Sequence, residues 1–179
     1  MITKTVETEI NEQIKREEHS SRLYLSMASW CQVNGYQGAA DFLYAQTDEE
    51  RMHQLKFIHY LNDRGGHAVL AELEKPALKF KSLPDIFKQV LTHEEYITAS
   101  INNLYAVALK EKDFTTGNFL QWFITEQIEE ESTARLVLDK IKLAGEEKGG
   151  LFLLDKELGT MAVAKRAAQI TAATANKGA

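Results

Sequence analysis

The chain has 179 residues, of which 44% are hydrophobic and 26% are charged, values typical of one soluble globular domain with a substantial core. The net charge of -5 disfavours a nucleic-acid-binding surface and suits the attraction of cations. The single cysteine, Cys31, favours a packed thiol in a reducing, cytoplasmic compartment. The N-terminus lacks the apolar run of a signal peptide, and no stretch approaches the ~20 apolar residues that span a membrane, so we expect no membrane partner.

Long segments without glycine or proline alternate with short segments that contain them. Segments free of these helix breakers predict four helices, over residues 1–34, 39–64, 85–116 and 118–144. The first two helices are joined by a turn near Gly35 and Gly38, and the last two are joined near Gly117. Each pair is therefore expected to form an antiparallel hairpin.

The middle connection, about residues 65–83, is too long for a hairpin and should run the length of the bundle. At its end, Ser82 and Asp85 flank Pro84, a pattern typical of a capped helix start. The sequence therefore predicts an all-α fold, a four-helix bundle with one long crossover.

The C-terminal part of the chain predicts a short fifth helix. Residues 151–158 follow the breaker pair at 149–150 and are too apolar to lie exposed on a monomer, which favours burial against a partner subunit. We accordingly divide the chain into a helical domain at residues 1–160 and a tail at residues 161–179. The tail is rich in alanine and threonine, and a frayed helix and a disordered segment both remain open for it.

Two triplets of ligand-type residues are copies of one another, with each member displaced by 77 positions. They are Glu17, Glu50 and His53 in the first half, and Glu94, Gln127 and Glu130 in the second half. The spacing places these residues on inward helix stripes that are otherwise apolar. Because ionised carboxylates are rarely buried without a counter-ion, the pattern predicts a cation among them.

Glu50 and His53 form a Glu-x-x-His pair, whose members share one face of a helix. One metal ion can bind His53, one oxygen of Glu50 and Glu17 of the neighbouring helix. The other oxygen of Glu50 can bridge to a second ion held by Glu94 and Glu130, with Gln127 close by. The four glutamates balance the charge of two divalent ions, and oxygen-rich ligands with one imidazole suit iron or manganese above all.

Two further features leave alternatives open. The acidic run at residues 129–131 is either a solvated helix face or part of an additional, weaker metal site, with the ligands Glu49, Glu126, Glu129 and Glu130. Tyr24 and Trp122 are core aromatic residues by default, although Tyr24 could equally serve in a redox or hydrogen-bonding role. The histidines outside the triplets, at positions 19, 59, 67 and 93, are interpreted as surface residues.

From about Thr5 to Thr160, the chain resembles the non-heme bacterial ferritins. The resemblance rests on several short motifs: Glu17, Glu49-Glu50-Arg51-Met52-His53, Glu94, Asn118-Phe119-Leu120-Gln121-Trp122, Glu126-Gln127-Ile128-Glu129-Glu130, Leu143-Ala144-Gly145 and Asp155-Lys156-Glu157-Leu158. It implies an iron-storage protein with ferroxidase activity, which oxidises Fe(II) with dioxygen or hydrogen peroxide and keeps ferric mineral inside a shell of twenty-four subunits.

The resemblance also implies roles for individual residues. The first iron would be bound by Glu17, Glu50 and His53, and the second by Glu50, Glu94 and Glu130. Gln127 would neighbour the second iron, Tyr24 would lie beside the first, and residues 151–159 would line the fourfold axis of the shell. A third site typical of the bacterial group would use Glu49, Glu126, Glu129 and Glu130. We expect the second iron to be held more weakly, since it has no imidazole ligand.

Related families fit the sequence less well. Heme-containing bacterioferritins have a second Glu-x-x-His and a methionine directly after the bridging glutamate, where this chain has Gln127, Glu130 and Arg51, so we expect no heme. The small DNA-protecting relatives build their site between subunits. A catalytic di-iron enzyme of the rubrerythrin or oxygenase kind and a passive metal-binding cage remain as rivals, although the chain has no Cys-x-x-Cys rubredoxin module.

Overall fold

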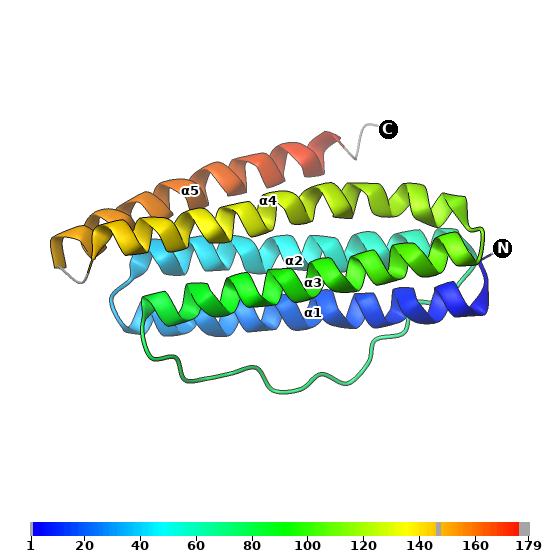
Figure 1. Cartoon of the computed structure of the whole chain (residues 1–179), viewed down its shortest axis with the longest axis horizontal. Helices are drawn as coiled ribbons and strands as arrows, with labels where there is room; N and C mark the ends of the chain where they lie inside the picture. Colours follow the sequence, from blue (N-terminus) through cyan, green and yellow to red (C-terminus); the bar gives the residue numbers. More distant parts are fainter. Residues whose placement is uncertain (1, 146–147, 176–179) are drawn as a thin grey trace.

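The computed structural model describes residues 2–145 and 148–175, and every regular element among them is a helix. The helices are α1 (Lys4–Val33), α2 (Gln37–Asp63), α3 (Leu83–Lys110), α4 (Phe114–Ala144) and α5 (Lys148–Ala175). Helices α1 to α4 form a four-helix bundle, and α5 folds back along it (Figure 1). The predicted all-α bundle is confirmed. Within the described ranges, no helix has the length and apolar character to cross a membrane.

Residues 64–82 form the long crossover, which runs from one end of the bundle to the other (Figure 1). It is tied to α1 by polar contacts, such as the Val69 amide donating to Asn11 Oδ1 at 2.7 Å. At its end, the Ser82 hydroxyl accepts from the Asp85 amide at 3.3 Å, which confirms the predicted capped start of α3. The crossover makes α3 parallel to α2 and brings the two hairpins face to face.

The break between α3 and α4 was predicted at Gly117, and this is wrong. Helix α4 begins at Phe114, and Gly117 lies in its first turn. The break is made by Asp113, whose carboxylate accepts from the Thr116 amide at 3.1 Å, and by Lys112, whose φ of 57° ends the preceding helix. Helix capping therefore decides this boundary, and the nearby glycine does not.

Helix α5 has 28 residues and extends through most of the segment that the sequence left as a tail. It packs mainly on α2 and also on α4, with Leu154, Leu158 and Ala162 buried along one stripe. Phe152 remains 70% exposed, and burial of this apolar surface against a partner subunit stays a prediction. The rest of the predicted tail, residues 176–179, lies outside the described residues.

Two apolar clusters fill the bundle, one around Leu43 and Phe87 and the other around Phe57 and Phe123. Along each of the four bundle helices, buried polar residues lie between the parts that belong to the two clusters. The polar layer is thus enclosed by packed hydrophobic side chains on both sides. Charged groups in this layer are shielded from bulk water, which strengthens every electrostatic interaction among them.

Candidate metal centre

All members of the two triplets lie in the polar layer, and none is more than 4% exposed. They come from all four bundle helices: Glu17 from α1, Glu50 and His53 from α2, Glu94 from α3, and Gln127 and Glu130 from α4. The long crossover is what makes this possible, because it sets the second hairpin against the first. The structure therefore places all six predicted residues in one layer.

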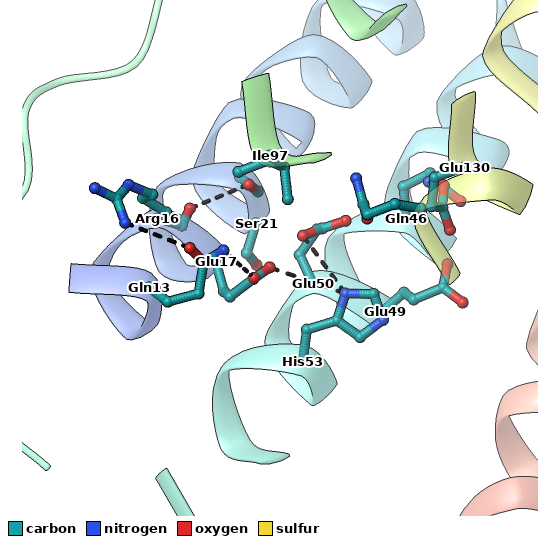
Figure 2. A network of polar contacts seen from close by, with 12 residues as sticks. Gln13, Arg16, Glu17, Ser21, Gln46, Glu49, Glu50, His53, Ile97 and Glu130 are labelled. Atoms are coloured by element: carbon teal, nitrogen blue, oxygen red, sulfur yellow. Dashed lines mark hydrogen bonds and ion pairs between the residues drawn. The ribbon is translucent and has the colours of Figure 1, made fainter. Parts of the chain in front are cut away.

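The first triplet forms a compact set of ligand atoms. His53 Nδ1 lies 3.9 Å from Glu17 Oε2 and 3.8 Å from Glu50 Oε2, and Figure 2 shows these side chains pointing toward one another. Both distances are too long for good hydrogen bonds. Glu17 Oε1 accepts from the Gln13 amide at 2.7 Å, whereas the buried Glu17 Oε2 has no hydrogen-bond partner.

This geometry fits a divalent cation. Metal–ligand bonds on the order of 2.1 Å would let one ion contact three atoms that all lie within 4.8 Å of one another, as those of Glu17, Glu50 and His53 do. The ion would also satisfy Glu17 Oε2, which otherwise remains a buried acceptor without a donor. The residues present therefore fit a metal ion at the first triplet.

Burial and mutual repulsion raise the affinity of these acids for protons. Burial, followed by the charge of Glu50, raises the pKa of Glu17 from 4.5 to about 8. Burial, followed by the charges of Glu94 and Glu130, raises the pKa of Glu50 well above 4.5. Burial raises the pKa of Glu94 to about 7, with a further contribution from Glu130. Without a cation, the site therefore retains protons that a metal ion would replace.

The second triplet is arranged differently, because donors already occupy its carboxylates. Glu94 Oε1 accepts from the Tyr24 hydroxyl, and Glu94 Oε2 accepts from the Gln127 amide at 3.1 Å. Glu130 Oε2 accepts from the Gln46 amide at 2.7 Å, and its Oε1 accepts from the ammonium of a lysine in α5 at 3.0 Å. In the described part of the chain, Glu94 and Glu130 do not belong to a compact set of acidic and imidazole ligand atoms.

The acids of the predicted third site are only partly brought together. Glu49 and Glu126 each place an oxygen within 4.8 Å of a nitrogen of His53 and of one another. Glu129 is exposed on α4 and does not join this set, and Glu130 faces Gln46 instead. The structure thus assembles Glu49 and Glu126 around His53, and the full third site stays a prediction.

Aromatic residues surround the centre. The resemblance implies that Tyr24 lies beside the first iron, and in the structure its hydroxyl donates to Glu94 of the second triplet. Burial, followed by the charge of Glu94, raises the pKa of Tyr24 well above 10, which keeps it a proton donor. The Trp122 ring meets the His53 ring edge-on at 5.4 Å, so Trp122 contacts the first triplet although its exposed fraction is 40%.

One histidine prediction is wrong. His93 was interpreted as a surface residue, but its ring is partly buried beside Tyr24, and its Nε2 lies 2.7 Å from the Ser20 hydroxyl. Burial, helped by His19, lowers the pKa of His93 to about 4, so the ring stays neutral. Its place in sequence directly before Glu94 is the signal that could have indicated burial near the centre.

Three residues of the centre were not predicted from sequence: Gln13, Gln46 and Lys165 of α5. Gln13 and Gln46 lie four residues before Glu17 and Glu50, so each shares a helix stripe with a predicted ligand. That spacing could have identified both as hydrogen-bond donors to the acids. Lys165 lies three residues after the buried Ala162, on the inward stripe of α5, but the sequence does not say where that stripe packs.

Comparisons with known proteins agree on one family. Residues 7–144 match the model of the ferritin-like domain family. The bacterial non-heme ferritin of Campylobacter jejuni is 45% identical over 93% of this chain and 99% of its own length. That of Escherichia coli O157:H7 is 40% identical over 85% of this chain and 92% of its own length.

A solved structure gives the same result at the level of the fold. The open-pore ferritin of the archaeon Archaeoglobus fulgidus superimposes with a TM-score of 0.87 at 40% identity, covering 89% of this chain and 98% of that one. The family-model match over residues 7–144 includes both triplets. The chain therefore belongs to the ferritin family, among the bacterial non-heme ferritins.

Proposed function

We propose that this protein stores iron and oxidises it, with Fe(II) as the substrate and dioxygen or hydrogen peroxide as the oxidant. The observation that carries the proposal is the unpartnered Glu17 Oε2, buried beside Glu50 and His53 in a set of atoms of the size that one cation needs. Relatives that are named bacterial non-heme ferritins, and the fold likeness to an archaeal ferritin, support the same conclusion.

In this proposal the first Fe(II) binds Glu17, Glu50 and His53. The second binds Glu94 and Glu130, with Glu50 shared between the two ions, and Gln127 is its neutral neighbour. Four carboxylates then balance two divalent charges, which removes the repulsion that raises the pKa values of the free acids. Fe(II) binding should accordingly release protons from the centre.

The oxidation balances over two iron ions. Each Fe(II) gives up one electron, and dioxygen accepts the two electrons with two protons to give hydrogen peroxide. With hydrogen peroxide as the oxidant, two further electrons and two protons give water. The Fe(III) product then leaves for a mineral, which we propose is held inside a shell of twenty-four copies of this chain.

The two positions should differ in affinity. The first offers an imidazole and an acceptor without a donor, whereas the second must draw Glu94 away from Tyr24 and Gln127, and Glu130 away from Gln46. Breaking these contacts opposes binding, so the second iron is held more weakly. Weak binding suits an ion that must leave after oxidation.

The test is anaerobic loading of the size-fractionated protein with Fe(II), followed by air, with oxygen uptake and retained iron recorded. A large shell that retains far more than two or three irons per chain is expected. Fixed retention of about two irons, the capacity of one bundle-core site, would indicate a di-iron enzyme, and uptake without oxygen consumption would indicate a passive cage. His53→Ala should abolish rapid oxidation, whereas His59→Ala, exposed on the same helix, should not.

A further inference from the structure

Lys165 reaches from α5 into the acid layer of the bundle. Its Nζ donates to Glu130 Oε1 at 3.0 Å and forms an ion pair with Glu49 Oε2. The lysine side chain is only 18% exposed, and Glu49 and Glu130 are 12% and 3% exposed. A charge at this depth is stable only because two carboxylates compensate it. Lys165 therefore acts as the resident counter-ion of this part of the centre.

The position of Lys165 is fixed by the docking of α5 on α2. At one end, the Asp155 carboxylate accepts from the amides of Gly38 and Ala39 at 3.0 and 2.9 Å, where α2 begins. At the other end, the Gln169 amide donates to the Ala45 carbonyl at 3.0 Å. Lys165 lies between these two anchors, so the packing of α5 on α2 holds its ammonium beside the acids.

Its partner Glu130 is a proposed ligand of the second iron, and both oxygens of its carboxylate already accept a hydrogen bond. One oxygen accepts from Lys165 and the other from Gln46. The acids of the first triplet have no such contact: Lys165 pairs with Glu49 and Glu130, whereas Glu17 and Glu50 face His53. Among the proposed ligands of the two irons, the Lys165 ammonium therefore contacts only Glu130.

We propose that Lys165 is a tethered cation that competes with the second metal ion, so that it sets the affinity of the second position and leaves that of the first unchanged. This inference rests on the proposed function and adds a specificity-determining residue to it. An ion that binds Glu130 must displace the ammonium, and Lys165 returns when the oxidised ion leaves. The helix α5 would in this way favour release of the product.

The test uses the full-length, assembled, metal-free protein titrated without oxygen by Co(II), with binding followed by calorimetry and by the cobalt absorption spectrum. Lys165→Met removes the charge and keeps an unbranched side chain. Lys165→Arg keeps the charge, and Arg166→Met removes one charge from the next, exposed position of the same helix as a matched control. Size-exclusion chromatography and circular dichroism check assembly, and Lys165→Gln replaces Lys165→Met if that variant does not assemble.

We expect Lys165→Met to tighten binding of the second ion at least about tenfold, since a competing charge pair is removed, while the first ion binds as before. Lys165→Arg and Arg166→Met should stay within about threefold of the unaltered protein, well inside that change. An unchanged second affinity, or an equal change for both ions, would overturn the inference alone. Failure of the unaltered protein to bind any ion would overturn the proposed function, and the inference with it.

Discussion

Replacing Glu17 by glutamine should stabilise the metal-free protein at neutral pH while removing its first metal position. Glutamine has the same shape as glutamate and can still accept from the Gln13 amide through its carbonyl oxygen. Its amide nitrogen replaces Glu17 Oε2, the buried oxygen without a hydrogen-bond partner, and can act as a donor within the acid layer. The substitution therefore replaces a buried ionisable group by a neutral one at almost constant volume.

The size of the expected stabilisation follows from the pKa of Glu17, which burial and the charge of Glu50 raise from 4.5 to about 8. Below pH 4.5 the group is protonated in both the folded and the unfolded chain. As the pH rises from 4.5 toward 8, only the unfolded chain gains the free energy of ionisation, so the stability of the native state falls. At pH 7 this loss is on the order of 3 kcal/mol, and glutamine does not incur it.

The assay is the thermal midpoint of metal-free protein at pH 5 and pH 7.5, in parallel with Glu12→Gln, an exposed glutamate on the same helix. With roughly 2–4 °C per kcal/mol for a chain of this size, Glu17→Gln should raise the midpoint at pH 7.5 by about 6–12 °C. Glu12→Gln should change it little. A midpoint at pH 7.5 below that of the unaltered protein, or a fall in the midpoint between pH 5 and pH 7.5 as large as that of the unaltered protein, would show that ionisation of Glu17 does not destabilise the fold.

Three further outcomes test other parts of the structure. Divalent metal should quench the fluorescence of Trp122 through the adjacent His53 ring, and Trp122→Phe should remove that response. Gly38→Ala should weaken the packing of α5 on α2, because an added Cβ would lie 1.7 Å from the Asp155 carbonyl oxygen. Amide hydrogen exchange in α5 should become faster, and an unaltered exchange rate would contradict this docking of α5. Asp113→Ala removes the cap of α4 and should lower stability by about 1–2 kcal/mol, whereas an unchanged thermal midpoint would argue against that cap.

Most of the fold is predictable from the sequence because glycine, proline and capping residues mark most of its boundaries. Ser82 before Pro84 starts α3 as expected, and the long crossover fixes the arrangement of the two hairpins. The boundary at Asp113 was missed because it depends on a side-chain cap and on one residue with positive φ, both inside a charged segment that contains no breaker. The full length of α5 was missed for a related reason, since its continuation depends on packing against α2.

The centre was predictable where its residues repeat along the chain. The 77-residue offset identifies Glu17 with Glu94, and the structure places both in the buried layer. The donors that hold the second triplet could not be predicted in the same way. Lys165 lies after the two repeated halves and reaches Glu130 only because α5 folds back along the bundle, a packing arrangement that no local sequence pattern indicates.

The most direct test of the account is anomalous X-ray diffraction from crystals of the assembled protein soaked anaerobically in Fe(II). We expect a strong iron peak between Glu17, Glu50 and His53, and a weaker one between Glu50, Glu94 and Glu130 at higher Fe(II) concentration. The second peak should appear together with a displaced Lys165. An empty first triplet at saturating Fe(II), with iron bound only to exposed acids, would contradict the claim that these buried residues are a metal centre.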